Sequence, residues 1–185
     1  MNQNLDLIKQ AIPTLIPKCG GCIVITIDGP AGSGKTTLAQ ELAHVLDATY
    51  TVHMDDLYEG WNSTLTSKLT NKMQNLLGNL SEKSEIVFTP FDWHTNTFAG
   101  EIRMPAPKYL IIEGVGSAQS AIRNFISLAL WIEVPAEEGL ARVIKRDGPM
   151  VVDYMPAFLV AQNSHFAKEE SKKSADYRLS GQGTV

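Results

Sequence analysis

The feature that most constrains this chain is a glycine-rich segment, IDGPAGSGKTTLA, at Ile27–Ala39. An almost continuous apolar run, Cys22–Asp28, leads into it, and apolar residues recur at helical spacing over Gly34–Leu46. A buried strand, a glycine-rich loop and a helix, in this order, form the context in which such a loop holds phosphate groups. The pattern GxxxxGK[ST], where x is any residue, is met by Gly29, Gly34, Lys35 and Thr36.

Each part of this loop has a physical role in binding a nucleoside triphosphate. Glycines let the backbone turn successive N–H groups inward, and the helix that follows adds unpaired N–H groups and a positive dipole end. Lys35 would neutralise the β- and γ-phosphates, and the hydroxyl of Thr36 would bind Mg²⁺. We therefore expect ATP and Mg²⁺ as cofactors. The residues expected to form the nucleotide site are Gly29, Pro30, Ala31, Gly32, Ser33, Gly34, Lys35, Thr36 and Thr37.

Apolar runs alternate with helical patterns, which favours an α/β fold with a mostly parallel sheet, in a single domain over residues 1–185. A short amphipathic helix and a turn are expected within residues 1–20, and the polar stretch Gly78–Glu85 is expected to be a loop. The expected strands are Cys22–Asp28, Thr49–Met54, Ile86–Phe91, Tyr109–Glu113, Leu128–Val134 and Asp176–Leu179. The other expected helices are Gly34–Leu46, Ser63–Leu80, Ala136–Arg146 and Met155–Lys172.

The composition argues against several classes of function. A net charge of −4 and a pI near 5.5 argue against a broad nucleic-acid surface. No stretch approaches the roughly 18 apolar residues of a membrane span, and no signal-peptide pattern opens the chain, so we expect a cytoplasmic protein without membrane partners. Cys19 and Cys22 precede a strand without a second cysteine pair for zinc, which favours a simple glycine turn. Whether they have a further role, and whether the chain forms a homo-oligomer, stays open.

Two acidic residues follow runs that are expected to be strands. Parallel strands end at a common edge, so these side chains would lie near the phosphates. Glu113 ends the run YLIIE and would hold the magnesium shell, the alternative being a strand-end residue in solvent. Asp55 follows the second strand and would accept the proton of an attacking hydroxyl, the alternative being a turn or helix cap.

Together these motifs resemble the uridine kinase group of P-loop kinases. The group's pattern Asp-x-Phe/Leu-Tyr is matched by Asp55, Leu57 and Tyr58, and the resemblance covers residues 23–181 in a few short blocks. It implies a three-layer P-loop NTPase fold with a five-stranded parallel sheet flanked by helices. It also implies a kinase that moves the γ-phosphate of ATP to a hydroxyl of a small molecule, with uridine or a related nucleoside as the first candidate. In that group, Asp55 would be the general base and Glu113 would assist Mg²⁺.

The segment TPFDWHTN, Thr89–Asn96, resembles the part of these kinases that lies over the nucleoside. Its rings would stack on a base and its polar groups would hydrogen-bond the base or sugar, the alternative being aromatic side chains packed under a loop. The family's tyrosine is replaced by Phe91, and the histidine comes earlier than in uridine kinases, which leaves specificity for pyrimidine nucleosides open. The residues expected to contact the acceptor are Asp55, Tyr58, Phe91, Asp92, Trp93 and His94.

The segment Leu130–Gly148 resembles the strand and lid helix of these kinases, with a short lid at about residues 147–153. Arg142 and Arg146 are four residues apart and share a helical face. Their guanidinium groups would stabilise the charge on a transferring phosphoryl group, the alternative being a solvated basic stripe. The residues expected to be catalytic are Lys35, Asp55, Arg142 and Arg146.

Two other functions stay open. The segment IDGPAGSGK resembles the phosphate loop of cytidylate kinases, which suggests a nucleoside monophosphate kinase. A phosphorylated acceptor needs extra arginines, however, and Arg103 is the only arginine between Thr49 and Lys108. From another class, the chain would be an ATP-binding switch or ATPase that turns over no small molecule, because a fold alone does not determine function.

Overall fold

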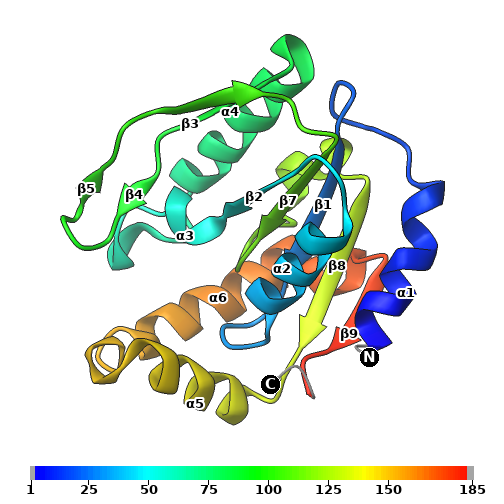
Figure 1. The fold of residues 1–185 in the computed structure, drawn as a ribbon. Coiled ribbons are helices and arrows are strands. Elements are labelled where there is room, and N and C mark those ends of the chain that lie inside the picture. Colours follow the sequence, from blue (N-terminus) through cyan, green and yellow to red (C-terminus); the bar gives the residue numbers. More distant parts are fainter. Residues whose placement is uncertain (1–2, 183–185) are drawn as a thin grey trace.

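The structure, a computed structural model, describes residues 3–182. Its centre is a sheet in which every neighbouring pair of strands is parallel (Figure 1). β1 lies in the middle, so the glycine-rich loop after it leaves from the centre of the sheet's carboxyl edge. In spatial order the five strands are β2 (Thr49–His53), β7 (Tyr109–Glu113), β1 (Ile23–Asp28), β8 (Leu128–Glu133) and β9 (Tyr177–Ser180).

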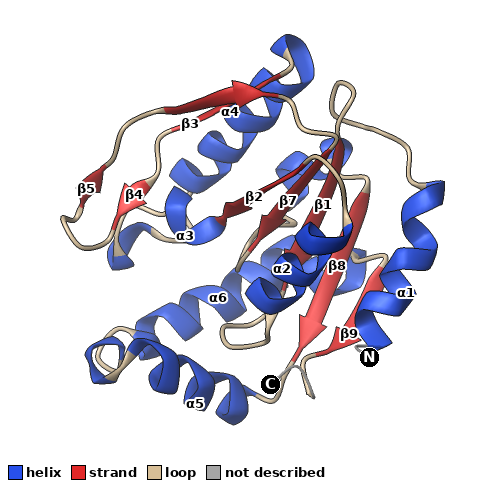
Figure 2. Ribbon diagram, viewed as in Figure 1, coloured by secondary structure: helices blue, strands red, loops and turns tan. Residues whose placement is uncertain are grey.

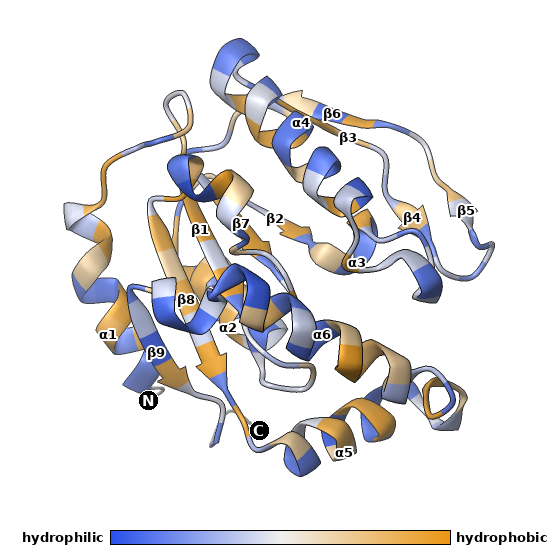
Figure 3. Cartoon of the chain, turned by 180° about the vertical axis from the view of Figure 1, so that it is seen from behind, coloured by the Kyte–Doolittle hydropathy of each residue, from blue (hydrophilic) through white to orange (hydrophobic). Residues whose placement is uncertain are grey.

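Helices cover both faces of this sheet and give the predicted three layers (Figure 2). All six residues of β1 are buried, as expected for a strand covered on both sides. Ile25 and Ile27 belong to an apolar cluster with side chains of α1 (Gln3–Ala11) and α2 (Lys35–Val45). The alternate residue Val24 belongs to a second cluster, with side chains of α4 (Ser67–Lys83) and η3 (Ser120–Phe125). Figure 3 shows the apolar strands between these layers.

The remaining helices connect the layers and border the carboxyl edge. The predicted N-terminal turn is present: Cys19 and Cys22 are buried, and their backbones form an isolated β-bridge across the turn. The expectations for residues 1–2 and 183–185 lie outside the described residues. No helix in the described part of the chain is long and apolar enough to cross a membrane. The remaining helices named above are η1 (Ile12–Thr14), α3 (Met54–Leu57), η2 (Trp61–Ser63), α5 (Ala136–Asp147), η4 (Pro149–Val151), α6 (Met155–Glu169) and α7 (Ser171–Ser174).

Residues 54–107 form a side arm beside β2, built from α3, η2, α4 and two small antiparallel sheets (Figure 1). One pairs β3 (Glu85–Phe88) with β6 (Ile102–Pro105), and the other pairs β4 (Phe91–Asp92) with β5 (Thr97–Phe98).

Two expectations for this arm were wrong. The predicted single strand Ile86–Phe91 is two strands outside the parallel sheet, with Pro90 at the break, because proline removes a backbone donor. The predicted loop Gly78–Glu85 is mostly helix, because buried Leu80 continues the apolar face of α4. The helix ends at Ser84, whose φ is 55°.

Candidate active site

The glycine-rich loop packs closely against α5. Gly32 has a φ of 73°, and a Cβ atom at this position would lie 2.1 Å from the carbonyl oxygen of Gly139 in α5. Gly34, with a φ of 94°, caps the start of α2 in the left-handed region. Both positions therefore require glycine, which lets the loop place its N–H groups at the positive end of α2.

Asp28, at the end of β1, organises the base of this loop. Its side chain is buried, and its Oδ1 atom accepts hydrogen bonds from the backbone N–H groups of Gly29 (2.8 Å) and Gly116 (2.9 Å). Burial raises the pKa of Asp28, while these hydrogen bonds and the charge of Lys35 act in the opposite direction. Asp28 thus joins the loops after β1 and β7, a role that its strand-end position alone did not indicate.

Lys35 is buried at the start of α2, and its Nζ atom donates to the carbonyl oxygen of Pro30 at 2.8 Å. Burial lowers the pKa of Lys35, and the charges of Glu113, Asp28 and Asp55 oppose this shift. The ammonium group therefore lies in the loop among carboxylates, within the group of charges where a phosphate would be neutralised.

Glu113 ends β7 and holds two partners. Its Oε1 atom accepts a hydrogen bond from the hydroxyl of Thr36 at 2.9 Å and lies 2.6 Å from Nδ1 of His53. Burial would raise the pKa of Glu113, but the bonds with His53 and Thr36 and the charge of Lys35 lower it below its usual value. Glu113 is thus a buried carboxylate at the phosphate loop rather than a solvated strand end.

Sequence reasoning missed His53. The parallel register of β2 and β7 pairs His53 directly with Glu113, which explains the contact between their side chains. The hydrogen bond to Glu113 is the main cause that raises the pKa of His53. Its position two residues before Asp55, at the end of a strand, was the available signal.

Asp55 lies in the first turn of α3, directly after β2. The side chain of Asp55 is in contact with solvent, but many protein atoms lie around it. The loss of hydration that they cause is the main reason why its pKa is raised. The charge of Glu113 adds to the shift, whereas Lys35 and Arg146 oppose it. No hydrogen bond among the described residues engages the carboxylate, so Asp55 is not a helix cap here.

The two predicted arginines of α5 lie in different surroundings. Arg146, in the last turn, hydrogen-bonds Asp147 at 2.6 Å, and this bond is the main cause that raises the pKa of Arg146; the charges of Asp55 and Glu113 also contribute. Arg146 therefore belongs to the charge cluster of the site.

The structure does not bring Arg142 into that cluster. Its NH1 group donates to the backbone carbonyls of Gly32 (3.3 Å) and Gly181 (3.0 Å), and its NH2 group bonds Glu138. The bonds to the two carbonyls hold the phosphate loop against the segment after β9, and three acceptors in all engage the guanidinium group. In this structure Arg142 makes a bracing contact, and its catalytic role stays a prediction.

The predicted acceptor residues divide in a similar way. Trp93 donates a hydrogen bond from Nε1 to the backbone carbonyl of Asp55 at 2.9 Å, so it lies beside the predicted base. Tyr58 is buried, and its hydroxyl donates to the carbonyl of Val115 at 2.7 Å, which makes it a packing residue.

The turn around Trp93 accounts for the rest of the predicted acceptor set. Phe91 is also buried and packs edge-on against the rings of Trp93 and Phe98. The carboxylate of Asp92 accepts the N–H groups of His94 and Thr95, which forms the turn that exposes His94. Phe91 and Asp92 therefore shape this turn, in line with the packing alternative.

α6 supplies two further features that the sequence did not indicate. Buried Gln162 accepts a hydrogen bond from the N–H group of Ala31 in the phosphate loop at 2.8 Å. Tyr154 and Phe158 contact the ring of Trp61, which belongs to the side arm. These contacts join segments far apart in the chain, so no local pattern could predict them.

The chain is similar in sequence to a known family and to known proteins. The family model of the AAA domain matches residues 25–154, which is more than half of the chain. Uridine-cytidine kinase C of Dictyostelium discoideum is 26% identical over 76% of this chain and 34% of its own length. The uridine kinase of Borrelia duttonii is 24% identical over 67% of this chain and 66% of its own length. The chain thus matches less than two thirds of the length of either relative.

A solved structure shares the fold. The structure of a possible uridine kinase from Bacillus stearothermophilus superposes with a TM-score of 0.67 at 23% identity, covering 95% of this chain and 96% of the other. The similarity extends over almost all of both chains, which agrees with the five-stranded parallel sheet flanked by helices.

Proposed function

This chain belongs to the AAA domain family, and from the geometry of its site we propose that it is an ATP-dependent kinase with a hydroxyl acceptor. One observation carries the proposal: Lys35 at the start of α2, Asp55 directly after β2, Glu113 at the end of β7 and Arg146 near the end of α5 lie at one edge of the sheet, where their charges act on one another's pKa values. Each group comes from a different segment of the chain. A loop that only binds nucleotide would not need a carboxylate without a hydrogen-bond partner in the described part of the chain and a separate arginine beside it.

The phosphate loop would hold the β- and γ-phosphates of ATP on its N–H groups and on Lys35. An open hollow of about 540 Å³ next to Gly181, lined by Val134, Leu179 and Gln182 among others, supports a place for the adenine. Arg142 braces the loop against this same segment. Nucleotide binding would therefore use both the loop and the chain after β9.

Mg²⁺ would be held by the oxygens of Thr36 and Glu113, which lie 2.9 Å apart. Hard oxygen donors suit Mg²⁺, which commonly takes one or two protein ligands and completes its shell with phosphates and water. The bound ion would neutralise charge on the phosphates.

Asp55 would accept the proton of the acceptor hydroxyl as it attacks the γ-phosphate. Within residues 3–182 its carboxylate has no hydrogen bond to break first, and its raised pKa brings it nearer to that of an effective base. Lys35 and Arg146 would stabilise the charge that spreads over the transferred group. Most of the rate enhancement would come from such positioning and electrostatics.

The charges of the side arm support a hydroxyl acceptor rather than a phosphorylated one. Arg103, the arm's one arginine, bonds Glu85 at 2.7 Å and Glu101 at 3.1 Å. Lys68 and Lys72 both pair with Glu59. Because these cations already have carboxylate partners, uridine or a related nucleoside is a better candidate than a nucleoside monophosphate.

The proposal is tested by measuring ADP formation from MgATP with and without uridine, cytidine and CMP, together with the phosphorylated products. We expect a nucleoside to stimulate turnover and to yield its phosphate ester. Preferential phosphorylation of CMP would instead establish a monophosphate kinase. ATP hydrolysis that no small molecule stimulates would leave the switch or ATPase class as the answer.

A further inference from the structure

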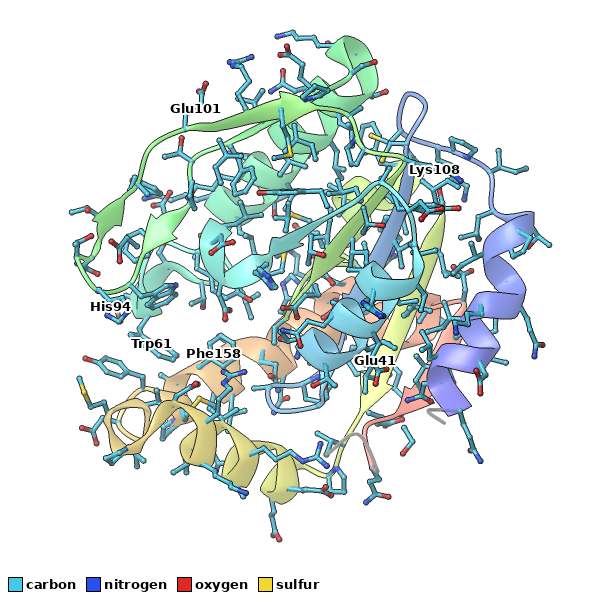
Figure 4. The ribbon with its side chains drawn as sticks, in the orientation of Figure 1. Glu41, Trp61, His94, Glu101, Lys108 and Phe158 are labelled. Atoms are coloured by element: carbon cyan, nitrogen blue, oxygen red, sulfur yellow. The ribbon has the colours of Figure 1, made fainter. Side chains whose placement is uncertain are left out.

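A cluster of aromatic rings joins the side arm to the start of α6. Its central member is Trp61 of η2, whose ring lies 5.0 Å from that of Tyr154 with an angle of 7° between their planes. Two other rings meet Trp61 edge-on: Trp93 at 5.3 Å and 62°, and Phe158 at 6.1 Å and 90°. Figure 4 shows Trp61 and Phe158 between the side arm and α6. We call Trp61 and Tyr154 the aromatic pair.

The aromatic pair differs from the other contacts in the cluster, because its two flat faces are parallel. Stacked and edge-on rings are both favourable packing contacts, but an edge-on pair has no two opposed faces between which a third ring could stack. A parallel pair, in contrast, presents two faces that a flat ring can enter when they separate by one ring thickness. Tyr154 is 47% exposed and follows the short lid, so its ring borders solvent.

The aromatic pair is also connected to the reacting groups. Trp93 contacts Trp61 with its ring and donates its Nε1 hydrogen to the carbonyl of Asp55. On the other side, the predicted lid, at about residues 147–153, joins Arg146 to Tyr154. A molecule held by the aromatic pair would therefore lie near Asp55, the predicted base, and next to the segment that follows Arg146.

On the basis of the kinase function proposed above, we propose that Trp61 and Tyr154 are specificity-determining residues that separate to hold a flat ring of the acceptor between their faces. Insertion exchanges one stacking contact for two, and the edge-on rings of Trp93 and Phe158 would border the inserted ring. Stacking tolerates different bases, because every base has a π-face. The aromatic pair would thus select a flat ring rather than one particular base.

Uridine and 5,6-dihydrouridine provide a direct test, because they carry the same sugar hydroxyls and only uridine has a flat ring. With MgATP, we expect a KM for uridine about tenfold or more below that for dihydrouridine, the scale of one lost base stack. Trp61→Leu and Tyr154→Leu should each raise the uridine KM by a similar factor and remove this preference, with the KM for ATP unchanged. Tyr154→Phe retains the ring and should keep the preference.

Phe98→Leu is the matched control. Phe98 is another exposed ring of the side arm, and its recorded partners are Phe91 and Lys72 rather than the aromatic pair. This variant should leave the ratio of the two KM values unchanged. If Trp61→Leu lowers the melting temperature but leaves that ratio as in the wild type, the aromatic pair is only a packing contact and the proposal is wrong.

A second measurement separates this proposal from the kinase function itself. If the wild-type protein phosphorylates neither compound, the proposed uridine kinase function fails, and the aromatic pair is judged by binding alone. Calorimetric titration of uridine in the presence of MgADP should then still show binding that Trp61→Leu weakens about tenfold. Absence of binding, or equal binding by both proteins, would overturn the proposal.

Discussion

Asp55 and Glu113 belong to one cluster of charges but differ in what surrounds each carboxylate. Glu113 lies against the Thr36 hydroxyl and the His53 ring, and the net effect of its surroundings lowers its pKa. Asp55 has no such partner among the described residues, and its pKa is raised. Neighbouring acidic groups whose pKa values are shifted apart commonly have different roles. The contrast favours Glu113 as the metal ligand and Asp55 as the base.

Replacing Asp55 tests the role of this residue. Asp55→Asn keeps the size of the side chain but removes the proton acceptor, so kcat should fall by roughly 100- to 10,000-fold, the range of general base catalysis. The KM for ATP should change little. Steady-state kinetics with uridine checks both values. An equal loss of ATP binding would show that Asp55 is a structural residue or a metal ligand instead.

The two arginines of α5 should give different kinetic effects. Arg146→Ala removes a charge near Asp55 and should lower kcat by roughly 100- to 1,000-fold, as expected for one donor to a transition state. Arg142→Ala removes the brace between Gly32 and Gly181 and should mainly raise the KM for ATP. Initial-rate kinetics over a range of ATP concentrations separates the two effects. A larger loss of kcat in Arg142→Ala would contradict this assignment.

At the scale of elements, α6 connects the phosphate loop to the rest of the molecule. Gln162 accepts a hydrogen bond from the loop at Ala31, and Tyr154 of the aromatic pair directly precedes the helix. At the other end, the carboxylate of Glu169 accepts hydrogen bonds from the backbone N–H (2.7 Å) and hydroxyl (2.6 Å) of Ser120. These contacts place α6 where its movement would affect the phosphate loop, the aromatic pair and η3.

The Glu169 contact should appear in the pH dependence of stability. Burial raises the pKa of Glu169, but the bonds from Ser120 outweigh it, so the pKa lies below the usual value of a glutamate, about 4.5. A depressed pKa stabilises the folded state above about pH 4.5, and this contribution is lost as the pH falls through the folded-state pKa. Glu169→Gln should therefore lower stability by roughly 1–3 kcal/mol at neutral pH.

Melting temperatures of the wild type and Glu169→Gln between pH 3 and pH 7 check this expectation. The two curves should converge at the acid end, because protonation removes the same interaction from the wild type. Glu82→Gln, at an exposed position of α4, is the control and should follow the wild type. A constant difference at every pH would show that the charge of Glu169 contributes nothing.

At the scale of the whole molecule, the nucleotide site joins segments that lie far apart in the sequence. The loop after β1 contacts α5 through Gly139, α6 through Gln162 and the segment after β9 through Arg142. The net charge of −4 does not exclude phosphate binding, because Lys35 and the backbone N–H groups of the loop act locally. A bound nucleotide should therefore stabilise the folded protein as a unit.

Thermal denaturation with MgATP measures this coupling. A ligand that binds only the folded state at 100 times its Kd adds about 2.7 kcal/mol to the free energy of unfolding. Lys35→Ala should abolish phosphoryl transfer and remove most of the nucleotide-induced rise in melting temperature. Lys83→Ala, an exposed site in the last turn of α4, should keep the full rise. An undiminished rise in Lys35→Ala would place the triphosphate elsewhere.

The sequence by itself determined the glycine-rich loop, the strands of the parallel sheet and the strand-end positions of Asp55 and Glu113. Such features depend on local patterns, because a strand buried on both faces and a phosphate loop each demand particular residues at adjacent positions. The strands of the side arm could not be predicted from such local patterns. In one of its two small sheets, β3 and β6 are held by packing with α4, which no local pattern predicts.

Only the tertiary structure decided which of the candidate side chains share the site. The register of β2 against β7 brought His53 to Glu113, and packing of the loop on α5 turned Arg142 away from the reacting groups. Trp61 and Tyr154 meet although most of the chain's core lies between them in sequence. Such contacts depend on how whole elements pack, because residues distant in sequence meet only after the layers have assembled.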